Sequence, residues 1–111
     1  MSSKIRILTT KSFDKTIKKL FKKYSSLIED LSVLKQAIIE NPTLSSALGN
    51  NCYKIRMKIT SKKQGKSGGA KVITYVLIDE HKITLLDIYD KSDRDSITDK
   101  ELQVLIKKAV Q

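Results

Sequence analysis

The apolar residues of this chain change their spacing near residue 50, and this change constrains the fold more than any other feature of the sequence. Before it, apolar side chains recur at helical intervals, and after it they alternate or run continuously, as is typical of strands. The helical positions are Phe13, Ile17, Leu20, Phe21 and Tyr24, followed by Leu27, Leu31, Leu34 and Ile38. The pattern therefore predicts an α+β fold.

The N-terminal part of the chain predicts one strand followed by two helices. Residues 3–9 alternate in polarity and predict a first strand. Ser12 is expected to cap the first helix, and the pair Ser25-Ser26 offers a cap for the second. Asn41-Pro42 should end that helix, because the residue before a proline is disfavoured in the helical conformation. Residues 43–51 are expected to form a loop.

The C-terminal part predicts three strands and a last helix. Residues 53–59 have period two, with Tyr53, Ile55, Met57 and Ile59 on one side and Lys54, Arg56 and Lys58 on the other. Residues 71–79 read as a central strand and residues 82–90 as its hairpin partner, with a turn at Glu80-His81. Thr98 and Glu101 have capping-box spacing at the start of a helix. We expect one domain over residues 1–111, an antiparallel sheet of about four strands with two N-terminal helices and a C-terminal helix.

Positive charge is concentrated in two blocks. The chain has 22 Lys and Arg against 12 Asp and Glu, a formal net charge of +10. Residues 1–27 contain eight bases and one acid, and residues 52–78 contain seven bases and no acid. Two basic blocks between acidic segments suggest one positive surface and an anionic partner.

Several function classes are excluded by the residues that are scarce. A single cysteine, Cys52, excludes an internal disulfide framework and a thiolate metal cluster, and a single histidine, His81, removes most zinc and Ser-His-Asp schemes. No apolar run approaches a bilayer span, and the first residues lack the apolar region of a signal peptide. We therefore expect a cytoplasmic protein with no metal site and no cofactor.

The strongest chemical feature is the cationic face of residues 53–59 together with the basic loop at 61–70. Lys54, Arg56 and Lys58 recur about every 6.6–7 Å, which is close to the spacing of successive phosphates in a nucleic acid strand. Three loop residues extend this predicted RNA-binding surface: Lys62, Lys63 and Lys66. Tyr53, Tyr75 or Tyr89 could stack on a base if one faces outward. The alternative is a solvated outer sheet face.

Three stretches resemble the RelE superfamily of bacterial toxins, and most of all its HigB-like branch. They are Tyr53-Lys-Ile-Arg56, Gly65-Lys-Ser-Gly-Gly-Ala-Lys71 and Leu85-Leu-Asp-Ile-Tyr89-Asp-Lys91. The close match covers about residues 53–101, and the upstream helices agree in pattern only. The combination of a glycine-lysine loop, an apolar strand and an Ile-Tyr-x-Lys strand end carries the resemblance.

The resemblance implies a toxin of a type II toxin–antitoxin system, a metal-independent endoribonuclease that cleaves mRNA on the ribosome and inhibits translation. It implies contact with ribosomal RNA and a cognate antitoxin, a helix-turn-helix protein encoded next to it. Lys54 and Arg56 would hold phosphates, and Lys66 would contact mRNA or ribosomal RNA. The implied catalytic residues are Lys71, which would stabilise transition-state charge, Lys91, and Tyr89, which would stack on or orient a base.

Two residues depart from the family pattern. Lys71 stands where the family usually has arginine, which loses the bidentate fork, and Asp93 stands where glutamate is more frequent. Two other functions stay open. A ParE-like inhibitor of DNA gyrase would share the fold, and a non-catalytic module would only bind RNA or the ribosome.

Overall fold

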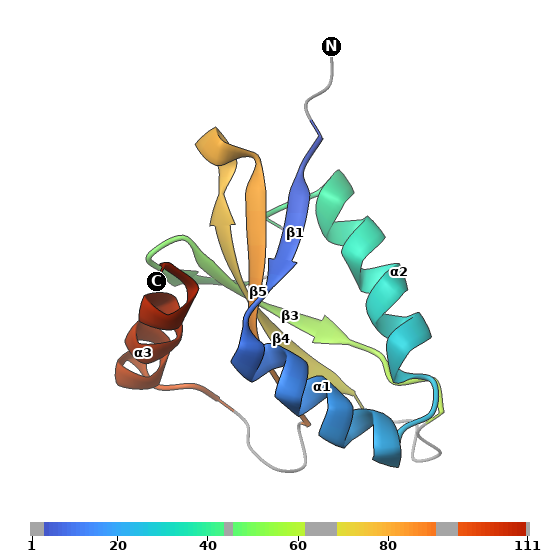
Figure 1. The fold of residues 1–111 in the computed structure, drawn as a ribbon. Helices are drawn as coiled ribbons and strands as arrows, with labels where there is room; N and C mark the ends of the chain where they lie inside the picture. The colour runs from blue at the N-terminus through green and yellow to red at the C-terminus, as the bar shows by residue number, and fades with distance from the viewer. Residues whose placement is uncertain (1–3, 44–45, 62–68, 91–95, 111) are drawn as a thin grey trace.

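A computed structural model describes residues 4–43, 46–61, 69–90 and 96–110 of the chain. The elements follow one another as β1(Arg6–Thr9), α1(Lys11–Lys23), α2(Leu27–Glu40), β2(Ser46–Gly49), β3(Cys52–Met57), β4(Ala70–Leu77), the 3₁₀ turn η1(Ile78–Glu80), β5(Lys82–Asp90) and α3(Asp99–Val110). The fold is α+β, as predicted, with helices on both faces of one sheet (Figure 1).

The sheet has five strands in the order β1-β5-β4-β3-β2. Strands β2 to β5 form an antiparallel meander, whereas β1 pairs with β5 in parallel. The expectation of an antiparallel sheet of about four strands is thus right for the centre and incomplete at both edges. Helices α1 and α2 connect β1 at one edge of the sheet to β2 at the other edge.

Strand β2 is the element that the sequence did not predict, since residues 43–51 read as a loop. It is a short edge strand whose residue Gly49 pairs with Cys52 across a two-residue turn. Asn50 and Asn51 have φ of 54° and 64° there, a left-handed conformation that asparagine tolerates better than most residues. The asparagine pair that reads as a strand breaker is the turn of a β2–β3 hairpin.

Two hydrophobic clusters hold the layers together, one on each face of the sheet. On one face, Phe13 of α1 and Leu27 and Ile38 of α2 pack against β3, β4 and β5. On the other face, Leu102 of α3 packs with Ile73 and with residues of β3 and β5. Helices α1 and α2 therefore cover one face and α3 covers part of the other.

The helix caps confirm one prediction and correct another. The predicted capping box at Thr98 and Glu101 forms, with each residue's side chain accepting the other's backbone N–H at 2.9–3.1 Å. Helix α1, however, is capped by Thr10 and not by Ser12, because the Thr10 hydroxyl oxygen accepts the Phe13 N–H at 3.0 Å. Ser26 precedes α2 but makes no capping hydrogen bond.

Candidate nucleic-acid interface

Strand β3 separates apolar and cationic side chains as its sequence predicts. Ile55 and Met57 are buried under α1 and α2, while Arg56 is exposed on the opposite face and Lys54 is half-buried there. Lys58 is exposed just beyond the end of the strand. The predicted cationic face of β3 is therefore present, on the side of the sheet that α3 covers in part.

Strand pairing brings three of the predicted site residues into one row across the sheet. Arg56 of β3 lies opposite Lys71 of β4, and Lys71 lies opposite Tyr89 of β5. Directly opposed residues share a face, and their Cβ atoms lie about 4.5–5.5 Å apart. The next row on this face joins Lys54 to Asp87 through Ile73. We call Arg56, Lys71 and Tyr89 the central row.

The three residues of the central row differ in exposure. Arg56 is exposed, Lys71 is half-buried, and Tyr89 is only 7% exposed because it packs in the cluster with Ile73 and Leu102. This burial leaves little of the Tyr89 ring available for stacking on a base. Tyr75 is half-buried beside the same cluster. The central row thus consists of an exposed cation, Arg56, a half-buried cation, Lys71, and a buried aromatic ring, Tyr89.

Four of the predicted site residues lie outside the part of the chain that the structure describes: Lys62, Lys63, Lys66 and Lys91. The described residue nearest to the predicted basic loop is Gly69, whose φ is +150°. A Cβ atom at Gly69 would lie 2.8 Å from the Met57 carbonyl oxygen. This glycine is therefore required by the close approach of two segments of its own chain.

Cys52 lies on the same face of the sheet and is buried in the cluster with Leu102. Burial raises the pKa of its thiol to about 11, so the side chain stays protonated at neutral pH. A thiol in this state is a poor nucleophile. Cys52 is therefore a small packed side chain and not a catalytic group.

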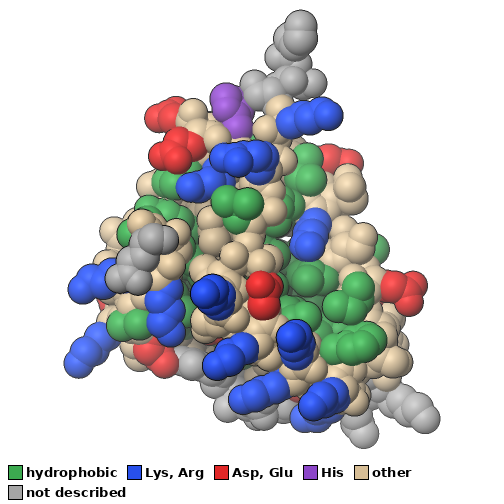
Figure 2. Space-filling view, viewed as in Figure 1, with side chains coloured by type: hydrophobic (Ala, Val, Ile, Leu, Met, Phe, Trp, Pro, Cys, Tyr) green, Lys and Arg blue, Asp and Glu red, His purple; other side chains and the backbone are tan. Residues whose placement is uncertain are grey.

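The lysines of α1 and the cations of β3 and β4 lie on opposite faces of the sheet, so these described residues do not form the one positive surface that the charge pattern suggested. Helix α1 packs on the face opposite to the central row, and its lysines point outward. Figure 2 shows Lys and Arg side chains gathered over α1. The exposed lysines of α1 are Lys11, Lys15, Lys18, Lys19, Lys22 and Lys23.

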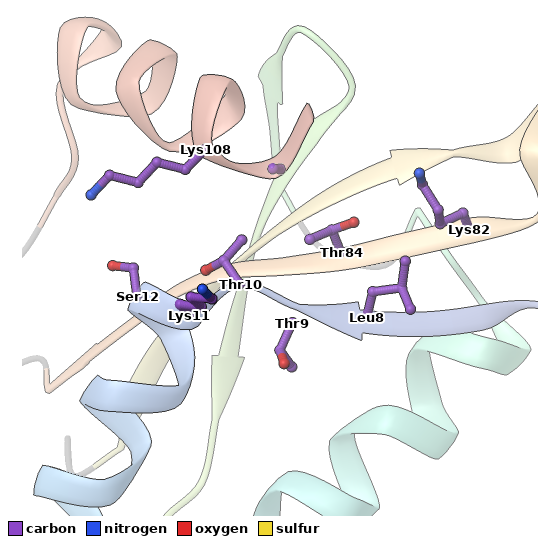
Figure 3. A pocket seen from close by; sticks show the side chains of 9 residues that line it. Leu8, Thr9, Thr10, Lys11, Ser12, Lys82, Thr84 and Lys108 are labelled. Carbon is purple, nitrogen blue, oxygen red and sulfur yellow. The ribbon is translucent and has the colours of Figure 1, made fainter. Parts of the chain in front are cut away.

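A cavity of about 460 Å³ lies where the start of α1 approaches the end of α3. Figure 3 shows Lys108 of α3 on the same side as Ser12 at the start of α1, with Thr10 lying between that pair and Thr84 and Lys82 of β5 further along. A second hollow of about 580 Å³ continues along α1 past Lys11, Lys15 and Lys18. None of the predicted site residues lines either hollow, so both belong to the basic region of α1.

Two sets of contacts that the sequence did not predict link the α1–α2 junction to the ends of β3 and β5. The Tyr24 hydroxyl donates to the buried Asp90 carboxylate at 2.5 Å. Asp30 and Ser26 bond the segment that follows β3. In the sequence Tyr24 reads only as part of an apolar stripe, and Asp30 is not singled out. The one sequence signal for the Tyr24 contact is the hydroxyl itself, since an aliphatic residue at this position would fill the core equally well.

The described residues contain neither a membrane-spanning helix nor a cluster of metal ligands. No helix among them has both the length and the apolar composition that crossing a bilayer requires. No group of three or more potential metal ligands is found among residues 4–43, 46–61, 69–90 and 96–110.

Comparison with known proteins relates the chain to a family of toxins. A family model described as the RelE toxin of the RelE/RelB toxin–antitoxin system matches residues 5–111. The structure is similar to that of an E. coli RelE toxin mutant, with two arginines replaced by alanine, in the free state. That similarity has a TM-score of 0.62 at 17% identity and covers 97% of this chain and 96% of the other. Comparison with functionally curated sequences gives no significant match.

Proposed function

Because the chain belongs to the RelE toxin family of toxin–antitoxin systems, we propose that it is a toxin that cleaves mRNA on the ribosome and so inhibits translation. Membership of this family implies an antitoxin as a partner. The observation that carries the proposal is the central row, in which Arg56 and Lys71 lie side by side on the sheet face that α3 covers only in part. The HigB-like branch and a helix-turn-helix antitoxin encoded next to this chain stay predictions.

The proposed reaction is attack of a ribose 2′-hydroxyl on the adjacent phosphorus. The 2′-oxygen forms a bond to phosphorus, its proton passes to a base, and the 5′-oxygen leaves and takes up a proton. The products are a 2′,3′-cyclic phosphate and a 5′-hydroxyl. The negative charge of the five-coordinate phosphorane is the feature that the protein must stabilise, and fixed cations do this at little reorganisation cost.

The central row supplies these cations in a fixed arrangement. Arg56 is exposed and suits a phosphate that approaches from solvent, since its guanidinium can make two parallel hydrogen bonds. Lys71, half-buried between Arg56 and Tyr89, is the better candidate for stabilising transition-state charge, because a less hydrated site strengthens the interaction. Lys54 and Lys58 extend the track along β3 for neighbouring phosphates.

The remaining assignments follow from the family likeness. Lys66 would contact mRNA or ribosomal RNA, Lys62 and Lys63 would add phosphate contacts, and Lys91 would complete the catalytic set. Action on ribosomes would make the protein cytoplasmic. The proposed cleavage itself uses no cofactor.

Expression in bacteria tests the proposal directly. The wild-type chain should arrest growth and produce cleavage within translated mRNA, and the double substitution Lys71→Ala and Lys91→Ala should abolish both. Unaffected growth and translation on wild-type expression would contradict the proposal. DNA-damage signalling without mRNA cleavage would instead identify a ParE-like gyrase inhibitor. Ribosome binding without cleavage would identify a non-catalytic module.

A further inference from the structure

One end of the sheet carries the central row, and three strands reach that end together. Met57 of β3 pairs with Ala70 of β4, which pairs with Asp90 of β5. This is the row next to the central row, one residue further along each strand. Contacts that hold this end of the sheet therefore act one residue away from Arg56 and Tyr89 and can affect the spacing between them.

The α1–α2 junction reaches the β5 side of this sheet end through Tyr24. Tyr24 ends α1 and is itself buried, and its hydroxyl donates to the Asp90 carboxylate at 2.5 Å. Asp90 is 1% exposed and is the last residue of β5, directly after Tyr89. Hydrogen bonds to a buried carboxylate are strongly directional and are costly to lose. Tyr24 thus fixes the strand end from which Tyr89 projects to the other face.

The same junction reaches the β3 side through Asp30 and Ser26. One oxygen of the Asp30 carboxylate accepts the Thr60 N–H at 2.9 Å, and the other accepts the Thr60 hydroxyl at 3.0 Å. The Ser61 N–H donates to the Ser26 hydroxyl oxygen at 2.8 Å, and that hydroxyl bonds Asp30 at 2.7 Å. The segment that leaves β3 runs beside the start of α2 (Figure 1).

Lys58 lies inside the region that these contacts hold. Ile59, its neighbour, is buried in the core, and Thr60 and Ser61 are bonded to the junction. On the other side the backbone of Gly69 lies so close to Met57 that an added Cβ atom would lie 2.8 Å from the Met57 carbonyl oxygen and 3.9 Å from the Lys58 Cα. The backbone that presents Lys58 beside Arg56 is therefore constrained from both directions.

We propose that Tyr24, Ser26 and Asp30 of the α1–α2 junction are positioning residues for RNA cleavage, which hold the β3 and β5 ends so that the central row keeps its spacing. This inference rests on the proposed function. The apolar contacts of Leu27 and Ile38 already attach α2 to the sheet, so the polar groups are not needed for attachment. Buried polar contacts add little net stability in general, but they restrict geometry, and misplacement of a catalytic group by about 1 Å can cost on the order of a hundredfold in rate.

Tyr24→Phe tests the β5 contact, with Thr10→Ala as its matched control. Both variants remove one hydroxyl at an end of α1. Thr10 caps the N-terminus of the helix, whereas Tyr24, which bonds Asp90, lies at its C-terminus. We expect Tyr24→Phe to lower the turnover rate of mRNA cleavage on ribosomes by about tenfold or more with little change in KM. Thr10→Ala should keep the wild-type turnover rate even if its Tm falls by as much as the Tm of Tyr24→Phe. Equal turnover in the two variants would overturn the proposal.

Asp30→Asn tests the β3 contact by a change of sign. The variant is one unit more positive, so a purely electrostatic account expects tighter RNA binding. The positioning account expects slower cleavage and an RNA affinity no higher than wild type, because Thr60 loses its two-oxygen partner. Glu29→Gln is the matched control, since it makes the same charge change on an exposed residue of the same helix turn. Cleavage by Asp30→Asn that matches Glu29→Gln would contradict the proposal.

Backbone amide signals separate failure of this inference from failure of the proposed function. In Tyr24→Phe and Asp30→Asn, the amide chemical shifts of Arg56, Lys71 and Tyr89 should move, whereas in Thr10→Ala and Glu29→Gln they should not. If the wild-type chain does not cleave RNA, the proposed function fails while these shifts still report on the junction. Unmoved signals in both junction variants would overturn the positioning role whatever the activity.

Discussion

Helix α1 and the strand pair β3–β4 both carry several cations, yet they present them in different ways. The lysines of α1 stand outward around much of an exposed helix surface, at intervals that the helix alone determines. Arg56 and Lys71 are fixed to each other by strand pairing, and the central row ends on a buried aromatic ring. Net charge attracts an anionic partner over a distance, whereas the register of paired strands determines where a reaction can take place.

This difference assigns separate roles to the two regions. Solvated lysines on long side chains raise association rates with polyanions through a long-range field. Cations held across a sheet can face a single phosphate together and need little rearrangement during reaction. We therefore expect the α1 region to act in attraction to the ribosome or to an acidic antitoxin, and the sheet region to hold and cleave RNA.

The largest effect should come from removing three cations of one region at a time. Replacing Lys54, Arg56 and Lys58 by alanine should weaken binding to single-stranded RNA by on the order of a hundredfold. The slope of log affinity against log salt should fall by about two, since each lost phosphate contact removes about 0.7.

The matched variant removes three exposed cations from α1: Lys15, Lys18 and Lys22. It should change the affinity for free RNA by less than about threefold and should mainly slow association with ribosomes. Titrations over a range of salt concentrations measure both variants. Equal losses of free-RNA affinity would erase the distinction between the two regions.

A second, smaller effect concerns the close approach that holds the sheet region. Gly69→Ala should destabilise the fold by about 1–3 kcal/mol, because φ is +150° and the new Cβ would lie 2.8 Å from a backbone oxygen. Gly49→Ala has φ of +89° but nothing within 4 Å of the Cβ position, so it should cost only about 1 kcal/mol. Urea unfolding measures both, and a larger cost at Gly49 would show that the approach of Gly69 to Met57 is not needed.

The smallest expected effect is a gain of activity. Lys71→Arg restores the residue that the family usually has and supplies a planar fork that matches a phosphate. We expect cleavage on ribosomes to become faster by about two- to fivefold. Lys18→Arg on α1 should leave the rate unchanged, because no register fixes that side chain to a partner. A gain from Lys18→Arg alone would indicate that α1 also contacts the scissile region.

The central elements were predictable because their apolar periodicity depends on local sequence. The pattern of β3, with Ile55 and Met57 inward and Arg56 outward, is fully present in the structure. The parallel pairing of β1 and the hairpin of β2 were not predicted, since both depend on which edge of the sheet is left open. Residues of a short edge strand bury little, so their composition resembles that of a loop.

The candidate site was predictable in its residue types and only partly in its geometry. The resemblance to a family pattern identified Arg56, Lys71 and Tyr89 as site residues, but it did not show that they lie opposite one another in the sheet. The burial of Tyr89 and the reason for Gly69 were not foreseen, because both depend on what packs from a distant part of the chain. The junction contacts of Tyr24 and Asp30 join residues 66 and 30 positions apart, respectively.

By itself the sequence determined the α+β class, the core positions of the helices and central strands, the cationic face of β3 and the likeness to RelE toxins. These follow from periodicity and residue type, which act over a few neighbouring residues. Only the tertiary structure decided that the lysines of α1 and the cations of β3 and β4 lie on opposite faces and that Arg56, Lys71 and Tyr89 share one row. It also decided that Tyr24 and Asp30 hold the ends of that row's strands. Those arrangements arise from strand register and from helix packing, which bring distant residues together and which no local pattern records.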